Sequence, residues 1–200
     1  FNSPSWVRSQ TNLGVLRDDQ VNIVVHGHEP VLSEMLVAAT QNPELMELAK
    51  SHGAQGVALS GICCTANEIL MRHGVPVAGN FLQQELALMT GVIDVMLVDV
   101  QCVFPATTEY QNCFHTKVIS TSPKAKVPNA LHIEFHEDKA YDIAKEIVRK
   151  AIDNYDARGD IKIPEYISEV VPGFSHEYIN YMLGGSYRAS FRPLNDAVMS

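Results

Sequence analysis

The sequence predicts an α/β fold built on a mainly parallel sheet. Three observations support this fold class. Apolar runs of strand length alternate with stretches of helical periodicity, most clearly at residues 21–27, 56–61 and 92–100. These runs are almost continuously apolar, as in strands buried on both faces. Each is followed by turn or polar residues that lead toward a helix. The pattern predicts a Rossmann-like three-layer domain, followed by a C-terminal helical or irregular extension.

Composition excludes several classes of protein. The 200 residues are 46% hydrophobic, which is enough for a substantial core. The net charge of -8, without any run of Lys or Arg, argues against nucleic-acid binding. No apolar run reaches the roughly 18 residues of a membrane span. The chain begins at Phe1 without a signal peptide or a starting Met, so we expect a processed product or a piece of a longer protein.

The first half of the predicted domain is a right-handed crossover. Residues 1–20 are polar and unpatterned, and the buried strand at 21–27 follows them. A helix begins near Pro30, because proline is favoured at the first helical turn. A second helix begins at Asn42-Pro43, and the strand at 56–61 comes next. Strand, helices and strand in this order predict parallel neighbours.

The next segments continue the alternation. We expect a helix at 64–72, a short strand and turn at 75–80, a helix at 81–90 and the most apolar strand at 92–100. In the helix at 81–90, the residues expected to face the core are Leu82, Leu86 and Met89.

The remaining elements are two strands and two helices. Residues 117–121 predict a strand, and the alternation at 131–135 predicts an edge strand. The longest helix is expected at 137–158, with Gly159 ending it. A further helix is expected at 176–183.

These elements predict three parts along the chain. Residues 1–20 form a lead-in segment, 21–159 form the Rossmann-like domain, and 160–200 start the following segment or domain. Pro164, Pro172 and Gly173 mark the change of character after the longest helix.

Three potential metal ligands follow three of the predicted strands. His28 follows the strand at 21–27, Cys64 follows that at 56–61, and Cys102 follows that at 92–100. Because the carboxyl ends of parallel strands meet at one edge of a sheet, we expect these side chains to converge on one metal site. The adjacent cysteines and the missing signal peptide also favour a reducing compartment, where cysteines serve reactivity or metal binding.

Neighbouring residues are assigned supporting roles. Adjacent cysteines point in different directions, so Cys64 is the predicted ligand and Cys63 a nearby thiol that tunes or protects the site. His28 lies beyond the strand and is preferred to His26, while Glu29 is expected to hydrogen-bond a neighbouring ring. The alternative interpretation of Cys63 and Cys64 is structural, as two small apolar residues packed at the start of a helix. Cys113 lies in a loop without an equivalent strand end and is left structural.

One His and two Cys suit zinc or an iron–sulfur cluster. The C-x-x-C pairs of zinc ribbons and the repeated C-x-x-C run of simple ferredoxins are absent. The sequence therefore leaves two possibilities: a zinc with an open position, or a cluster whose other ligands lie beyond residue 200. Nucleotide binding is disfavoured, because no G-x-G-x-x-G or G-x-x-x-x-G-K-[ST] motif is present.

Several motifs together resemble those of one enzyme family. They are Val-His-Gly-His-Glu-Pro (25–30), Gly-Ile-Cys-Cys-Thr-Ala-Asn-Glu (61–68), Met-Arg-His-Gly (71–74), Ala-Gly-Asn-Phe-Leu-Gln-Gln-Glu (78–85), Asp-Val-Gln-Cys (99–102) and Ser-Tyr-Arg-Ala-Ser-Phe-Arg-Pro-Leu-Asn (186–195). The chain is similar to the catalytic subunit of the nickel-iron-sulfur carbon monoxide dehydrogenases of anaerobic microbes. The resemblance covers essentially the whole chain and corresponds to the middle, Rossmann-like portion of that subunit.

The resemblance implies a nickel-iron-sulfur (Ni-4Fe-4S type) cluster. In it, His28 and Cys64 hold the iron outside the cubane, Cys102 holds a cubane iron, and Cys63 is a thiol beside them that is not a ligand. The remaining cluster ligands, the proton-transfer residues and the cysteines of further 4Fe-4S clusters would lie outside this piece.

The same resemblance implies reversible oxidation of CO with water to CO2, two protons and two electrons. It also implies a ferredoxin-like electron acceptor, a homodimer and a cytoplasmic location. This piece alone is expected to be inactive.

Three other functions remain open from the residues. The first is a hybrid-cluster (hydroxylamine reductase-like) protein of related fold, which would lack nickel. The second is a zinc hydrolase or deaminase using one His and two Cys, which would carry one colourless zinc. The third is an interaction domain, in which replacing His28 or Cys64 would leave function intact.

Overall fold

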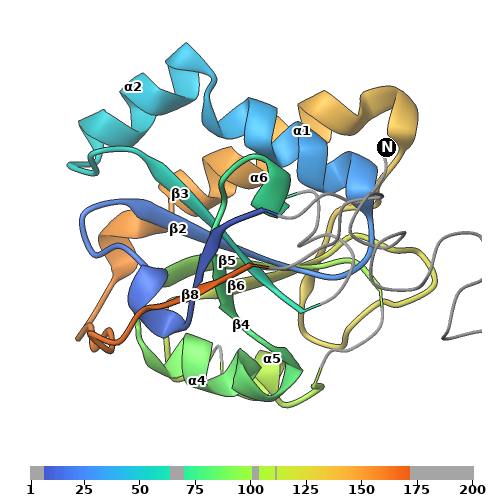
Figure 1. Cartoon of the computed structure of the whole chain (residues 1–200). Coiled ribbons are helices and arrows are strands. Elements are labelled where there is room, and N and C mark those ends of the chain that lie inside the picture. The colour runs from blue at the N-terminus through green and yellow to red at the C-terminus, as the bar shows by residue number, and fades with distance from the viewer. Residues whose placement is uncertain (1–6, 64–69, 101–103, 111, 172–200) are drawn as a thin grey trace, which may run out of the picture. The chain divides into compact units, whose positions relative to one another are not determined.

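The computed structural model describes residues 7–63, 70–100, 104–110 and 112–171 (Figure 1). The chain divides into two compact units. One is Ser9–Glu169, and the other combines Phe1–Arg8 with Val170–Ser200. The first unit contains the predicted domain 21–159 and, in addition, residues that the sequence assigned to its flanks. The boundaries at residues 20 and 159 remain predictions.

The fold is an α/β sheet of eight strands in the order β7-β6-β5-β2-β3-β4-β1-β8. Every pairing from β7 through to β1 is parallel. The predicted fold class is therefore confirmed. The strands are β1 (Ser9–Thr11), β2 (Val21–His26), β3 (Val57–Ile62), β4 (Val77–Gly79), β5 (Ile93–Val98), β6 (Lys117–Ser120), β7 (Leu131–His132) and β8 (Ser168–Val170).

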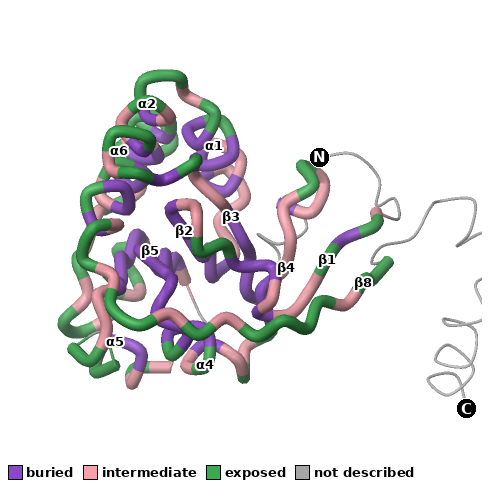
Figure 2. The backbone as a smooth tube through the Cα atoms, turned by 90° about the vertical axis from the view of Figure 1, so that its left-hand side faces the viewer, coloured by how far each residue is buried: buried purple, intermediate pink, exposed green. Residues whose placement is uncertain are grey.

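Helices cover both faces of the sheet. On one face lie α1 (Pro30–Thr40), α2 (Pro43–Ser51) and α6 (Ala140–Ile152), and on the other lie α4 (Gln84–Met89) and α5 (Thr107–Tyr110) (Figures 1 and 2). Short 3-10 turns are formed by Leu13–Val15, Phe81–Gln83, Glu137–Lys139 and Tyr155–Ala157. Among the described residues, no helix combines the length and apolar character that crossing a membrane requires.

The starts of α1 and α2 follow from local chemistry. The side chain of Glu29 accepts a hydrogen bond from Val31 N and caps α1, whose first residue is Pro30. Asn42 caps α2 in the same way, with Pro43 as the first helical residue. Proline costs nothing there, because the first amide groups of a helix have no partner within the helix.

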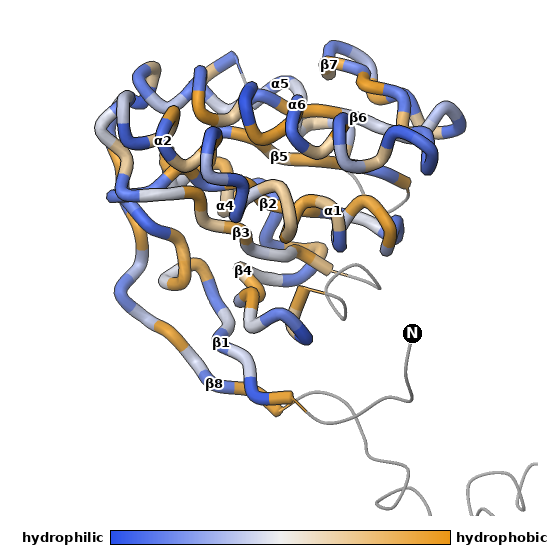
Figure 3. Tube along the Cα trace, turned by 90° about the horizontal axis from the view of Figure 1, so that it is seen from above, coloured by the Kyte–Doolittle hydropathy of each residue, from blue (hydrophilic) through white to orange (hydrophobic). Residues whose placement is uncertain are grey.

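The apolar strands divide their side chains between two cores. In β2, Ile23 and Val25 pack in the core beneath α1 and α6, whereas Val24 packs on the opposite side of the sheet. In β5, Met96 and Val98 join that second core, while Val95 and Leu97 join the first. Both faces of these strands are therefore buried, which explains why β5 is so continuously hydrophobic (Figure 3).

The predicted orientation of the helix at 81–90 is wrong. Leu82, Leu86 and Met89 are 74%, 51% and 56% exposed. The residues that α4 buries are Gln84, Ala87 and Leu88, and the last two pack in the second core. Both triplets have helical spacing, so the periodicity alone could not decide which one faces inward.

Other differences from the predicted elements concern their limits. The helix expected at 137–158 is α6 between two short 3-10 turns. The lead-in contains β1, which pairs with β4. The helix expected at 64–72 and that at 176–183 fall wholly or mostly outside the described residues, although 70–72 are helical.

A buried ion pair holds the amino end of β5. The carboxylate of Asp94 accepts hydrogen bonds from Arg158 Nε at 2.9 Å and Nη2 at 2.5 Å. It also accepts from the backbone N of Asn22 at 2.7 Å, and His115 Nε2 lies 2.9 Å from it. This network fastens the chain after α6 to the amino edge of the sheet.

Candidate metal centre at the carboxyl edge of the sheet

The topology creates a switch point between β2 and β5. From β2 the chain proceeds to β3 on one side, and it later returns to place β5 on the other side. The segments leaving β2 and β5 therefore diverge at the carboxyl edge. Open α/β sheets bind their ligands in such a crevice.

His28 lies in this crevice, just beyond β2. Its Nδ1 is 3.2 Å from the carbonyl oxygen of Val100, at the end of β5. A carbonyl can only accept, so Nδ1 donates this hydrogen bond, and in the neutral ring Nε2 carries the lone pair. A metal-binding histidine is commonly oriented by this kind of bond from its other ring nitrogen. The ring of His28 thus has the kind of hydrogen bond that commonly orients a metal-binding histidine.

His26 is part of the sheet. It ends β2, is fully buried, and pairs in register with Ile62 of β3 and Val98 of β5. Burial, with a smaller contribution from the neighbouring imidazole of His28, lowers the pKa of His26 to about 4. A neutral imidazole therefore lies beneath the crevice at neutral pH.

Glu29 has a defined structural task, since its carboxylate caps α1. The expected hydrogen bond from Glu29 to a neighbouring ring remains a prediction.

Cys63 directly follows β3 and has a left-handed conformation, with φ of 62°. Its backbone N donates to Gly79 O at 3.3 Å, and its half-buried side chain packs beside the second core. For a residue other than glycine this backbone is uncommon, and such strain often occurs at functional sites. The chain therefore turns sharply at the residue before Cys64.

Cys64 and Cys102 lie outside the described residues. The convergence of His28, Cys64 and Cys102 accordingly remains a prediction. Within the described part of the chain, no group of three or more His, Cys, Asp or Glu side chains could hold a metal ion. Cys113 is exposed and lies in the loop before β6, and its structural assignment remains a prediction.

The structure brings one residue to this edge that the sequence analysis missed. The carboxylate of Asp99, directly after β5, accepts hydrogen bonds from the backbone N of His28, Glu29 and Val100. Burial raises the pKa of Asp99, and those three hydrogen bonds act in the opposite direction. Asp99 is the first residue of the motif Asp-Val-Gln-Cys (99–102), in which the sequence predicted a role only for Cys102.

A second group of residues supports the segment after Cys102. The buried side chain of Gln84 accepts a hydrogen bond from Phe104 N at 3.3 Å and donates to Phe81 O at 3.0 Å. Gln83 belongs to a capping box with Asn80. The motif at 78–85 therefore has a structural basis in this chain.

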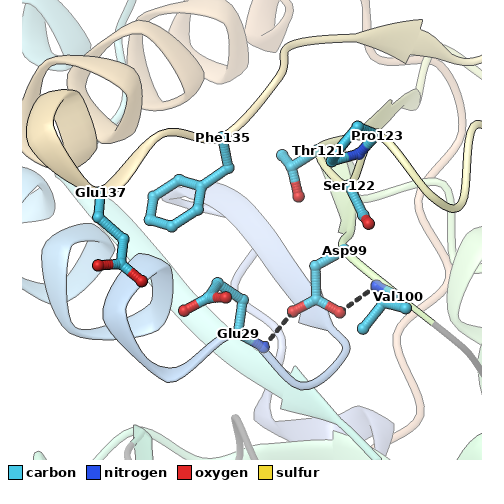
Figure 4. A pocket seen from close by; sticks show the side chains of 8 residues that line it. All are labelled: Glu29, Asp99, Val100, Thr121, Ser122, Pro123, Phe135 and Glu137. Atoms are coloured by element: carbon cyan, nitrogen blue, oxygen red, sulfur yellow. Dashed lines mark hydrogen bonds between the residues drawn. The ribbon is translucent and has the colours of Figure 1, made fainter.

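A cavity of about 240 Å³ opens beside Asp99 (Figure 4). Its walls come from the ends of β2, β5 and β6 and from the segment before α6. The side chains that shape it include Glu29, Asp99, Thr121, Ser122, Phe135 and Glu137. The carboxylates make this part of the edge acidic.

Comparisons with known proteins place the chain in a family. The model of the Prismane/CO dehydrogenase family matches residues 1–200. Carbon monoxide dehydrogenase 1 of Methanosarcina mazei is 54% identical over 200 residues, which cover 99% of this chain and 31% of that protein. Carbon monoxide dehydrogenase 1 of Carboxydothermus hydrogenoformans is 45% identical over 206 residues, covering 100% of this chain and 32% of the relative.

Solved structures agree with these sequences. A nickel-free carbon monoxide dehydrogenase from Thermococcus sp. AM4 superposes with a TM-score of 0.85 at 48% identity, over 99% of this chain and 31% of that one. An acetyl-CoA synthase/carbon monoxide dehydrogenase described with NiZn[Fe4S4] and NiNi[Fe4S4] clusters superposes with a TM-score of 0.84 at 43% identity. The match covers 99% of this chain and 30% of that one. The chain spans about a third of the length of the curated relatives it matches. It belongs to the Prismane/CO dehydrogenase family.

Proposed function

We propose that this chain is part of a carbon monoxide dehydrogenase. The enzyme reversibly oxidises CO with water to CO2, two protons and two electrons at a nickel-iron-sulfur cluster. The observation that carries the proposal is 54% identity to a carbon monoxide dehydrogenase over 99% of this chain. The orientation of His28 by Val100 O supports it independently, because that bond leaves Nε2 available to a metal.

In this proposal His28 and Cys64 hold the iron outside the cubane, and Cys102 holds a cubane iron. Cys63 is a thiol beside the site that is not a ligand. An imidazole and two thiolates are the donors expected for iron in a sulfide cluster. The left-handed turn at Cys63 supports the assignment, since it redirects the chain immediately before Cys64.

The residues of this chain hold, orient and shield the site. When bound, the cluster supplies a soft metal for CO and a Lewis-acidic iron that lowers the pKa of water. His28 is fixed through its ring and its backbone at the crevice between β2 and β5. His26, buried and neutral, adds no positive charge beneath it at neutral pH. The apolar ends of β3 and β5, Ile62 and Val98, keep water out of the sheet below.

Further features belong to the same proposal. They are 4Fe-4S clusters elsewhere in the full-length chain, a ferredoxin-like acceptor for the two electrons, a homodimer, and a cytoplasmic, anaerobic setting. The piece alone is predicted to be inactive, because the remaining ligands of the cluster lie outside it.

The alternatives have less support. The family model covers prismane proteins as well as CO dehydrogenases, but the similar curated proteins are named carbon monoxide dehydrogenases. A zinc hydrolase finds no counterpart among them.

The deciding experiment is metal analysis and a CO-oxidation assay on the full-length protein purified without oxygen. We expect nickel, iron and sulfide together with CO-dependent electron transfer. Zinc alone would contradict the proposal in favour of a hydrolase, and an iron–sulfur protein without nickel or CO turnover would favour a hybrid-cluster protein.

A further inference from the structure

The loop that carries His28 is fastened to the end of β5 by one buried carboxylate. The backbone N of His28 donates to both oxygens of Asp99, at 2.7 Å each. Glu29 N donates to Oδ2 at 2.5 Å, and Val100 N donates to Oδ1 (Figure 4). Asp99 is only 4% exposed, so these bonds are shielded from water. Charge-assisted bonds of this kind are among the stronger hydrogen bonds in proteins.

The fastening is reciprocal. Asp99 N donates to His26 O at 3.2 Å, which continues the ladder between β2 and β5. Val100 O accepts a hydrogen bond from Nδ1 of His28. Residues 99–100 therefore hold both the backbone and the ring of His28, and the same segment continues directly toward Cys102.

Gly27 makes room for this carboxylate. A Cβ atom at Gly27 would lie 1.6 Å from Asp99 Oδ1 and 2.1 Å from its Cγ. Gly27 also has a φ of +150°, which side-chain-bearing residues rarely adopt. The sequence His-Gly-His thus permits a close approach between the loop and the aspartate.

We propose that Asp99 is a positioning residue for the metal centre. Its carboxylate fixes the loop of His28 against residues 99–100, so that the imidazole keeps a constant position at the carboxyl end of β5. This role rests on the proposed function, because it assumes that His28 binds iron.

The geometry requires a carboxylate rather than an amide. Oδ1 serves His28 N and Val100 N, while Oδ2 serves His28 N and Glu29 N. An asparagine presents one acceptor and one donor, so its NH2 group must face either Val100 N or Glu29 N. Asp99→Asn therefore removes at least one contact and sets two donors against each other, with almost no change in volume.

The test uses Asp99→Asn in the full-length holoenzyme, purified without oxygen. We expect a folded protein with a changed Mössbauer spectrum of the cluster iron, less iron per chain, and CO oxidation reduced about 10- to 100-fold. Gly27→Ala is the second variant, because it displaces the carboxylate without altering its charge. Gly27→Ala should shift the Mössbauer spectrum in the same way. If Asp99→Asn does not fold, the spectrum of Gly27→Ala tests the positioning role of Asp99.

Two controls separate positioning from general effects. Glu137→Gln removes a carboxylate from the wall of the same cavity, and Asp94→Asn removes a buried one from the other end of β5. Both should leave the Mössbauer spectrum per folded chain unchanged. A wild-type spectrum in folded Asp99→Asn would overturn the role of Asp99, and so would an equal spectral change in either control.

A further variant separates this role from the proposed function. If His28→Ala loses iron while Asp99→Asn keeps a wild-type spectrum, only the positioning role fails. If His28→Ala itself retains all its iron and CO oxidation, the assignment of His28 as a ligand fails, and the positioning role fails with it. The proposed function fails instead if the wild-type full-length protein contains no nickel or does not oxidise CO.

Discussion

The rings of Phe81 and Phe104 lie 4.3 Å apart between centroids, with their planes inclined by 38°. Phe81 begins the turn before α4, and Phe104 comes two residues after Cys102. The contact therefore joins the turn before α4 to the segment that follows Cys102, a predicted cluster ligand. Gln84 strengthens the connection by accepting a hydrogen bond from Phe104 N.

We predict that Gln84→Leu weakens cluster retention. The substitution leaves Phe104 N without its acceptor, and because this amide is only partly buried we expect a cost near the lower end of the about 1–3 kcal/mol of a buried unsatisfied group. Amide hydrogen exchange at residues 104–110 should accelerate, and iron should leave the full-length protein faster in the presence of a chelator. Glu85→Gln, one position along, serves as the control and should behave as wild type. Wild-type exchange and iron loss in Gln84→Leu would contradict this role.

The exposed and buried sides of α4 give a second prediction. Leu88 is fully buried in the second core, whereas Leu86 is 51% exposed. Leu88→Ala should lower the free energy of unfolding by about 2–5 kcal/mol, as large-to-small core changes do. Leu86→Ala should change it by no more than about 0.5 kcal/mol. Urea unfolding of both variants measures the difference. Equal losses would contradict the prediction, and a larger loss in Leu86→Ala would show that α4 packs by its other side.

The buried ion pair of Asp94 and Arg158 gives a third prediction. Their side chains are 0% and 7% exposed, so removing the guanidinium leaves a buried carboxylate with fewer partners. Arg158→Met should destabilise the protein by about 3–5 kcal/mol. Asn22 N and His115 still contact Asp94, which favours the lower part of that range.

Arg149→Met is the matched control for this pair, since Arg149 is exposed near the end of α6. Its effect should stay within about 0.5 kcal/mol. Similar urea midpoints for the two variants would mean that the buried pair contributes little.

Much of the fold could be predicted because both faces of its central strands are buried. Continuous apolar runs located β2, β3 and β5, and the prolines after Glu29 and Asn42 located the starts of α1 and α2. The inward face of α4 could not be predicted, because Gln84 is buried through hydrogen bonds that no hydropathy pattern reveals.

The candidate site was predictable to a smaller extent. The position of His28 at the carboxyl edge followed from the strand that precedes it. The proposed role of Asp99 did not, because it depends on the absence of a side chain at Gly27, which follows a different strand. Such a contact between distant segments appears only when β2 and β5 are seen to be neighbours.

The most direct test of the metal centre is anomalous diffraction at the iron absorption edge, from crystals of the full-length protein grown without oxygen. We expect an iron peak bonded by His28 Nε2 and Cys64 Sγ, and a cubane iron bonded by Cys102 Sγ. An iron site remote from His28, or a zinc peak between these three side chains, would contradict it.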